Sequence, residues 1–379
     1  MLEENIIEEL TVIRKSLHSH PEISGEEYET QKQIIRYLTA KTTAKIQEIA
    51  NTGVIATFNG LAVGPTVMIR GDIDALPITE TNNFEHRSTI SGVSHKCGHD
   101  GHTCNLLGLA VLLSKEPITK GTVLLLFQPA EENGMGAEAV IKDKTFKNIN
   151  IDYVFALHNL PGYPLNQIVV KDNEFTGNVK SIIIKLNGKT AHAAEPEKGH
   201  NPSLAIAELL QYADQITLNE PAKKDFFLAT PIHLNMGELA YGISAGYGEV
   251  HFTIRSWSTT LMEEKSTALV NHIEQVCKLH NLEPEISWTQ VFVANINHPK
   301  AVESIRNAAK NNGFMVSERL YPFKWGEDFG LFTQKFKGAM FGVGSGIDTP
   351  SLHNPDYDFP DEILPTGINM FHQIIKTLN

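Results

Sequence analysis

Apolar positions in the first half of the chain follow two different spacings. Residues 3–18 and 27–39 repeat apolar side chains at helical spacing, which predicts two amphipathic helices. Short unbroken apolar runs follow, with helical patterns between the first three. Such runs are typical of strands buried on both faces, as in parallel sheets. The predicted strands are residues 66–69, 122–127, 153–157 and, far downstream, 339–343. These parts of the chain favour an α/β domain.

Residues 178–291 follow another pattern. Alternating strand-like runs and amphipathic helices succeed one another there in the order βαββαβ, which is typical of a ferredoxin-like layer of helices on an antiparallel sheet. The expected strands are 179–186, 226–235, 249–256 and 284–291, and the expected helices are 202–216 and 261–280. We therefore expect an α+β domain inserted into the α/β domain, which would occupy residues 1–177 and resume over 292–379.

Polar side chains come directly after each predicted buried strand. Asp72 and Asp74 follow the first strand, Glu131 and Glu132 the second, His158 the third, and His353 lies beyond the fourth. In an open α/β sheet, ligands bind beyond the carboxyl ends of the strands. We therefore expect these side chains to converge on one edge of the sheet.

The segment Cys97–His102 (CGHDGH) places one thiol and two imidazoles within six residues. Thiolate and imidazole suit zinc and the neighbouring transition metals. The alternative is a glycine-rich loop with incidental histidines. Cys97 and His99 are the better candidate ligands, because residues two apart can point the same way in an extended loop. His102 is expected to begin a helix and to cap or orient rather than to bind.

Two adjacent carboxylates, Glu131 and Glu132, follow the strongest predicted strand. Such a pair usually belongs to a solvated surface. Here the buried strand before it argues for another role, since adjacent side chains diverge and one can bind metal while the other faces the substrate. A glutamate beside a metal-bound water can remove its proton and later protonate the leaving amine.

Taken singly, the remaining candidates are weak. A lone histidine such as His158 or His353 is more often a structural group, and Asp74 could be a turn aspartate before a proline. Asp74 could instead hydrogen-bond to a metal ligand and so hold that ligand in place. Together with a thiolate, a carboxylate and a free base, these residues indicate hydrolytic metal chemistry.

Composition narrows the class of partner. The chain has 32 basic and 44 acidic residues and a formal charge of −12, which argues against nucleic acid and anionic membranes as partners. The N-terminal segment has no basic region followed by an apolar one, so we expect no secretory signal. Three cysteines suit a reducing, cytoplasmic compartment better than a disulfide framework. Cys104 and Cys277 lie in apolar stretches and are expected in the core, unlike Cys97.

The predicted insert contributes two further candidates. His192 lies where a strand ends in a turn, and by itself it means little. Arg255 could anchor a substrate carboxylate, because a guanidinium matches a carboxylate in bidentate geometry. Its alternative role is that of a surface arginine on a strand.

As a set, these motifs resemble the dinuclear-metal peptidases of the aminoacylase and carboxypeptidase type. Within that family the sequence is most similar to the amidohydrolase branch, which includes N-acyl amino acid amidohydrolases, hippurate hydrolases and auxin-conjugate hydrolases. The matching segments run in family order along the whole chain. They are LHSHPE (17–22), RGDIDALP (70–77), CGHDGHT (97–103), QPAEE (128–132), LHN (157–159), AHAA (191–194), EDF (327–329) and LHNP (352–355).

The resemblance implies a mixed-sheet, metallo-exopeptidase-like catalytic domain interrupted by a smaller ferredoxin-like dimerisation domain. It implies two divalent ions, zinc, manganese, cobalt or nickel, with Glu131 as general base and Asp74 in support. The implied ligands are Cys97, His99, Glu132, His158 and His353. His192 would stabilise the tetrahedral intermediate, often from the partner subunit, so a homodimer is expected. The implied reaction is hydrolysis of N-acyl amino acids to a carboxylic acid and an amino acid.

One segment departs from the family pattern. Members commonly carry Asn-Val-Ile-Pro before the strand that ends in arginine, whereas residues 241–245 here read YGISA. The asparagine and proline of the family stretch are absent here, whereas Arg255 matches the arginine that ends the family strand. Two alternatives to an N-acyl amino acid hydrolase stay open. One is a dipeptidase or aminopeptidase with the same metals, and the other is a binding protein that has lost catalysis. A purely structural zinc site fits less well, because such sites close with four protein ligands, often several cysteines close in sequence.

Overall fold

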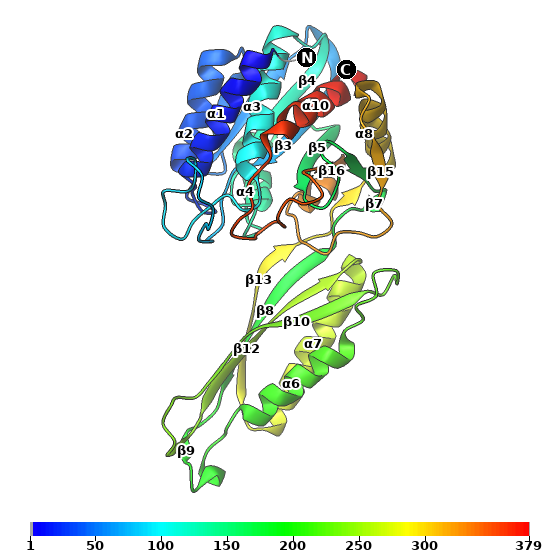
Figure 1. Ribbon diagram of the computed structural model, residues 1–379. Coiled ribbons are helices and arrows are strands. Elements are labelled where there is room, and N and C mark those ends of the chain that lie inside the picture. Colours follow the sequence, from blue (N-terminus) through cyan, green and yellow to red (C-terminus); the bar gives the residue numbers. More distant parts are fainter. Residues whose placement is uncertain (1–2, 379) are drawn as a thin grey trace. The chain divides into compact units, whose positions relative to one another are not determined.

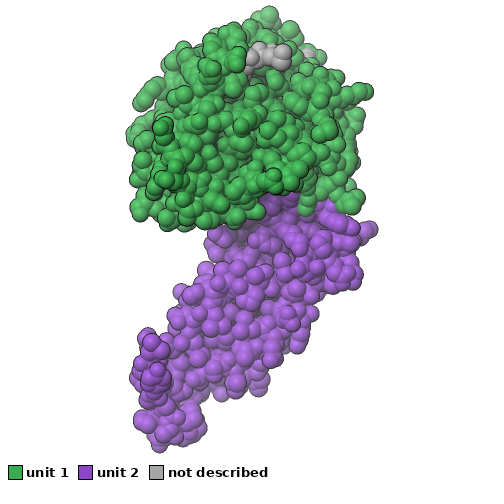
Figure 2. Space-filling view, viewed as in Figure 1, with its two compact units in different colours: residues 1–175, 295–320, 327–379 green, residues 176–294, 321–326 purple. Residues whose placement is uncertain are grey.

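The computed structural model describes residues 3–378, which form two compact units (Figure 2). One unit comprises residues 1–175, 295–320 and 327–379, and the other comprises residues 176–294 and 321–326. Within the described residues, no helix has an apolar stretch long enough to cross a bilayer. The first unit contains the predicted strand-end residues.

The first unit is built on a mixed sheet of eight strands in the order β1-β2-β4-β3-β5-β16-β6-β15 (Figure 1). The four predicted buried strands are its centre, and each pairs with its neighbour in parallel, as expected. Antiparallel pairing of β1 with β2, β2 with β4 and β6 with β16 makes the sheet mixed. The strands are β1 (Lys45–Ile49), β2 (Gly53–Asn59), β3 (Ala62–Asp72), β4 (Lys120–Gln128), β5 (Tyr153–Leu160), β6 (Ile168–Val170), β15 (Val316–Glu318) and β16 (Lys337–Gly344), and a separate pair joins β7 (Asn173–Glu174) to β14 (Ile296–Asn297).

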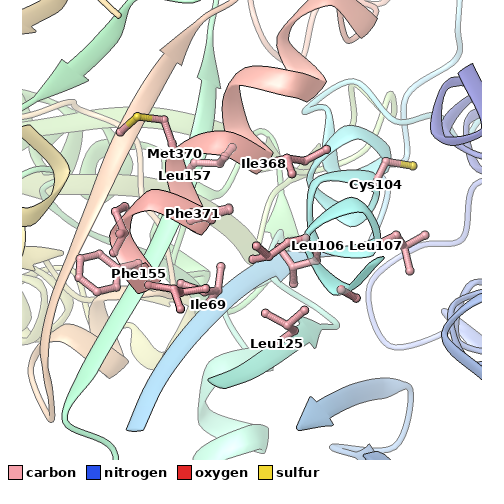
Figure 3. Packing of buried hydrophobic residues seen from close by; sticks show 14 of the residues in the cluster. Ile69, Cys104, Leu106, Leu107, Leu125, Phe155, Leu157, Ile368, Met370 and Phe371 are labelled. Atoms are coloured by element: carbon pink, nitrogen blue, oxygen red, sulfur yellow. The ribbon is translucent and has the colours of Figure 1, made fainter. Parts of the chain in front are cut away.

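Helices cover both faces of this sheet, so its central strands are apolar on both sides. Ile69 of β3, Leu125 of β4 and Phe155 of β5 point to the face covered by α3 and α10, where they meet Leu106 and Phe371 (Figure 3). This core excludes water from the centre of the unit. The helices are α1 (Glu4–Ser19), α2 (Tyr28–Lys41), α3 (His99–Lys115), α4 (Gly136–Lys142), α5 (Lys144–Lys147), α8 (Pro299–Asn312), α9 (Gly330–Thr333) and α10 (Leu364–Leu378), with a 3₁₀ turn, η2 (Asp361–Ile363).

The second unit has the βαββαβ order expected of a ferredoxin-like layer. Its antiparallel sheet has the order β10-β12-β8-β13, and two helices, α6 and α7, cover one face (Figure 1). The elements are β8 (Asn178–Asn187), α6 (Ser203–Ile216), β10 (Phe227–Met236), β12 (Tyr247–Ser256), α7 (Thr259–Leu279) and β13 (Glu283–Phe292). A small outlying pair joins β9 (Ala191–His192) to β11 (Ile243–Ser244), near a 3₁₀ turn, η1 (Pro196–Lys198).

Residues 321–326 belong to the second unit, although the sequence placed them in the larger domain. Their contacts explain the difference. Arg255 Nη1 donates to the carbonyl of Lys324 at 2.6 Å, and Lys324 Nζ donates to Asn219 Oδ1 at 2.7 Å. Cys104 and Cys277 lie in the two cores, as predicted.

Candidate metal centre

The side chains predicted at the strand ends meet in the first unit. Donor atoms of Cys97, His99 and His158 lie within 4.8 Å of one another, and so do those of Cys97, Glu132 and His353. The two groups share Cys97. All five side chains that the sequence predicts as ligands therefore fall into two overlapping donor sets.

The loop from Cys97 to His99 takes its shape from a left-handed glycine. Gly98 has φ +92°, and a Cβ there would approach the Asn159 side chain to 2.8 Å. Gly98 is the N-cap of α3, so this helix begins at His99 and not at His102 as the sequence suggested. His102 hydrogen-bonds through both ring nitrogens, to Asp72 and Asn159.

His99 presents one ring nitrogen to the centre of the site. Its Nδ1 donates to Asp74, at 3.0 Å to the backbone oxygen and 3.1 Å to Oδ1, which leaves Nε2 as the lone-pair nitrogen of the neutral ring. His99 Nε2 lies 3.7 Å from Glu132 Oε1. Both atoms are buried and have no hydrogen-bond partner among residues 3–378. A cation between them would satisfy both.

Cys97 and His353 complete the two donor sets. Cys97 Sγ is 3.6 Å from His158 Nε2, and His353 Nε2 is 3.6 Å from Glu132 Oε2. The backbone N–H of His353 donates to the carbonyl of Lys96 at 2.8 Å, which joins the distant His353 loop to the Cys97 loop. His353 has φ +66°, a rare conformation for a residue other than glycine and one that clusters at functional sites.

Acidic groups outnumber basic ones in this pocket. Burial raises the pKa of Glu132 to about 8, and Asp74 and Asp72 add to the rise while His99 opposes it. Burial would lower the pKa of His99, but Asp72, Asp74 and Glu132 together raise it to about 10. Both shifts show that the pocket favours added positive charge. The donor chemistry, the two unpartnered atoms and this charge imbalance fit a divalent metal ion.

Glu131 lies beside the donor sets but belongs to a different network. One of its oxygens is within 4.8 Å of the donor atoms of His99 and Glu132, and its Oε1 accepts from the backbone N–H of Asp328 at 3.4 Å. Burial raises the pKa of Glu131 well above its ordinary value, and the nearby carboxylates of Glu327, Glu132 and Asp328 raise it further. A carboxyl group in this setting holds a proton readily.

Residues that the sequence analysis did not single out fix the backbone and the acidic side chains around Glu131. Ala130 has φ +53°, and its N–H donates to Glu27 Oε1 at 2.8 Å, which fixes the turn between β4 and Glu131. Arg70, fully buried, pairs with both Glu327 and Asp328 at 2.9 Å. One indication of these residues was present in the sequence. Arg70 lies in the RGDIDALP segment (70–77), and Glu327 lies in the EDF segment (327–329).

A second buried ionic network lies behind the Cys97 loop. His18 of α1 hydrogen-bonds to Asp100 at 2.9 Å and to Glu80 at 3.1 Å, and Lys96 pairs with Glu80. Arg14, also on α1, donates to Asp358 at 2.6 Å. This network therefore fixes α1 to residues on both sides of the candidate ligands Cys97 and His99.

The pKa of His18 gives a test of this network. Burial lowers the pKa of His18, but its hydrogen bonds to Asp100 and Glu80 raise it to about 9. The raised value stabilises the fold fully below the unfolded pKa of about 6.5, and the contribution is lost as pH rises towards 9. We expect His18→Gln to remove about 3 kcal/mol of this pH dependence, measured by urea unfolding at about pH 6 and about pH 10.

His20→Gln is the matched control, because His20 is exposed near the same end of α1. It should keep the wild-type loss of stability at high pH. An unchanged pH dependence in His18→Gln would contradict the assignment.

Asp74 supports two of the candidate ligands at once. Besides His99, it accepts the backbone N–H of Glu132 at 3.0 Å and the hydroxyl of Ser24 at 2.7 Å. We expect Asp74→Ala to weaken metal binding by roughly 10–100-fold, measured by competition with a chromogenic chelator. Ser24→Ala, which leaves the carboxylate in place, should change it far less. Equal affinity of Asp74→Ala and wild type would show that Asp74 has no supporting role.

The two candidates of the second unit have different surroundings. His192 is exposed on β9, and its Nδ1 accepts the backbone N–H of Ala194 at 3.0 Å, so the neutral ring carries its proton on Nε2. His192 pairs in register with Ile243 of β11, inside the unusual segment 241–245. Arg255 uses part of its guanidinium to hold Lys324.

A cluster of thiol, imidazole and carboxylate donors at the carboxyl edge of a mixed sheet, with a spare buried carboxylate, defines a metal-dependent hydrolase. Comparison with known proteins agrees. Residues 68–377 match the model of peptidase family M20/M25/M40. The chain therefore belongs to this family, and it is a metal-dependent amidohydrolase.

Similar proteins cover nearly the whole chain. An uncharacterized hydrolase of Staphylococcus haemolyticus is 33% identical over 381 residues, which are 97% of this chain and 98% of the relative. The N-acetylcysteine deacetylase of Bacillus subtilis is 29% identical over 370 residues, 96% of this chain and 94% of the relative. The crystal structure of a dinuclear metal-binding M20 peptidase of Bacillus subtilis aligns with a TM-score of 0.83 and 27% identity, covering 99% of each chain.

Proposed function

We propose that this protein hydrolyses the amide bond of N-acyl amino acids and releases a carboxylic acid and a free amino acid. The observation that carries the proposal is the buried Glu131 carboxylate beside the two donor sets. The similarity to an N-acetylcysteine deacetylase supports an acylated amine as the substrate. The free, buried cysteines support a reducing, cytoplasmic setting.

Two divalent ions per chain would be held by the side chains that the sequence analysis named. One donor set comprises Cys97, His99 and His158, and the other comprises Cys97, Glu132 and His353. Thiolate and imidazole donors favour zinc, cobalt or nickel over calcium and magnesium, and the carboxylate donor also suits manganese. Such ions, when bound, polarise an amide carbonyl and make a water molecule more acidic.

The protein's own groups would then move the proton. Glu131 accepts a proton from the attacking water and delivers it to the leaving nitrogen, which converts a poor leaving group into a neutral amine. The pKa of Glu131, which burial raises, suits a carboxylate that must hold this proton between the two steps. Asp74 keeps His99 in the tautomer that leaves Nε2 available.

The second unit would supply substrate contacts and the subunit interface. Nε2–H of His192 is a donor suited to the oxyanion that forms at the carbonyl, and Arg255 is suited to the substrate carboxylate. β10 is an edge strand of its sheet, and Ile232 and Leu234 expose 61% and 51% of their surface along it. An exposed apolar edge strand is a ready pairing surface, which supports a homodimer.

A substrate panel tests the proposal. N-acetyl, N-benzoyl and indole-acyl amino acids would be compared with free dipeptides, using chelated protein and protein restored with zinc, manganese or cobalt. We expect metal-restored cleavage of the acylated substrates alone. Cleavage of free dipeptides alone would make the protein a dipeptidase or aminopeptidase. If the metal-loaded protein cleaved none of the substrates, the result would instead support a binding protein that has lost catalysis.

A further inference from the structure

Two histidines and a glutamate meet on the open face of the sheet in the second unit. His233 of β10 is paired in register with His251 of β12. Glu249 lies two residues before His251 on the same strand, and residues two apart in a strand share a face. Val250 and Phe252, between and beyond them, are buried in the core under α6 and α7. The three polar side chains therefore point away from that core and towards one another.

A β-bulge places His233 opposite His251. Pro231 pairs with Phe252, and the next paired residue of β10 is His233, so Ile232 is the extra residue. Without this insertion Ile232 would oppose His251, and His233 would point to the other face. Bulges commonly re-aim a side chain in this way. The local backbone thus produces a direct cross-strand pair of imidazoles.

Both histidines place a ring nitrogen close to a carboxylate oxygen of Glu249. His233 Nε2 lies 3.2 Å from Glu249 Oε1, His251 Nε2 lies 3.9 Å from Glu249 Oε2, and the ring centroids are 4.9 Å apart. Donors bound tetrahedrally to zinc at about 2.0–2.2 Å are separated by about 3.4 Å. The 3.2 Å separation is close to this value, and the 3.9 Å separation exceeds it by about 0.5 Å.

His251 and Glu249 are prepared for this role. His251 Nε2 is shielded from solvent and has no hydrogen-bond partner among residues 3–378. The hydroxyl of Tyr247 donates to Glu249 Oε2 at 2.9 Å, which fixes the carboxylate as an outer partner fixes a metal ligand. This hydrogen bond, with that of His233, also lowers the pKa of Glu249 and favours its charged form.

Two basic residues lie on strands beside the cluster. Lys185 of β8 is opposite Glu249 in register and is itself opposite Glu285 of β13. Arg255, further along β12, is engaged with Lys324. Among the described residues, the ion pairs of Glu249 are with His233 and His251, and neither Lys185 nor Arg255 pairs with it.

We propose that His233, Glu249 and His251 form a binding site for a divalent transition-metal ion such as zinc, separate from the catalytic donors of the first unit. Two imidazoles and one carboxylate suit zinc, nickel or copper and not calcium or magnesium. Three protein ligands leave a fourth position for water or for a group from another molecule.

Equilibrium dialysis against micromolar zinc tests the site. The full-length protein should hold one zinc ion more than the double variant His233→Gln/His251→Gln. The variant should hydrolyse the best acylated substrate at the wild-type rate, because neither residue belongs to the catalytic centre. His280→Gln is the matched control, since His280 forms a single pair with Glu208 at 2.9 Å, and it should bind as much zinc as wild type.

A further variant, Tyr247→Phe, and an anomalous difference map test the location of the zinc ion. Tyr247→Phe should weaken zinc binding at this site several-fold without unfolding the strand. Crystals of the protein with zinc should give an anomalous peak between the three side chains. Equal zinc content in wild type and the double variant, or no peak there, would overturn the proposal. Because catalytic-site substitutions would leave this zinc ion in place, failure of the proposed hydrolytic function would be seen separately.

Discussion

Replacing Glu131 by glutamine is expected to lower kcat by roughly 10²–10⁴-fold while the protein keeps its metal. Glutamine has nearly the same shape and can still accept the Asp328 N–H, but it cannot take a proton from water. Stability should not fall, because burial and the neighbouring carboxylates already raise the pKa of Glu131 and disfavour its charged form. Steady-state kinetics and metal analysis of the same sample give the result.

Glu132→Gln is the informative comparison for that variant. Glu132 has an unpartnered buried oxygen 3.7 Å from His99 Nε2, so its loss should reduce both metal content and activity. Adjacent residues of the same type would then have separable roles. Near-normal turnover in metal-loaded Glu131→Gln would exclude Glu131 as the base.

Arg70→Met is expected to destabilise the protein by about 3–5 kcal/mol, which is the usual cost of breaking a buried ion pair from one side. Arg70 is buried on β3 and contacts Asp72, Glu327 and Asp328 as well as Gln128 Oε1 at 2.9 Å. Methionine fills much of the same volume but leaves these carboxylates uncompensated in the core. Urea unfolding at neutral pH measures the loss.

The control for Arg70→Met is Arg306→Met. Arg306 also pairs with several acids, Asp172, Glu303 and Glu318, but it lies at the surface. Exposed pairs contribute about 0–1 kcal/mol, so this variant should stay close to wild type. If both variants lost a similar amount of unfolding free energy, burial would not be the reason for the contribution of the Arg70 ion pairs to stability.

The apolar pattern predicted the central strands because each of them is buried on both sides. β3, β4, β5 and β16 keep that local signal, and the pairing is parallel as expected. α8 was not predicted, although Pro299 at its start and Gly313 in the left-handed conformation after its end are recognisable boundaries. β1 has only one buried residue, so its apolar signal is weak.

The site was only partly predictable, because strand ends are local features and ion networks are not. The rule that ligands gather beyond strand ends predicted the position of Glu131 and Glu132 beside the donor atom of His99. The rule placed His158 after its strand, but His158 lies within β5, because this strand continues to Leu160 by pairing with Gly344 of β16. Two partners of Arg70, Glu327 and Asp328, lie more than 250 residues away along the chain, and no local pattern shows such a contact.

The most direct test of this account is an anomalous difference map from crystals of the active protein, recorded at the absorption edge of its restored metal. The account predicts two peaks in the first unit, each within bonding distance of side chains from the set Cys97, His99, Glu132, His158 and His353, with Glu131 beside them and not bonded. An active protein with no metal at these five side chains would contradict it.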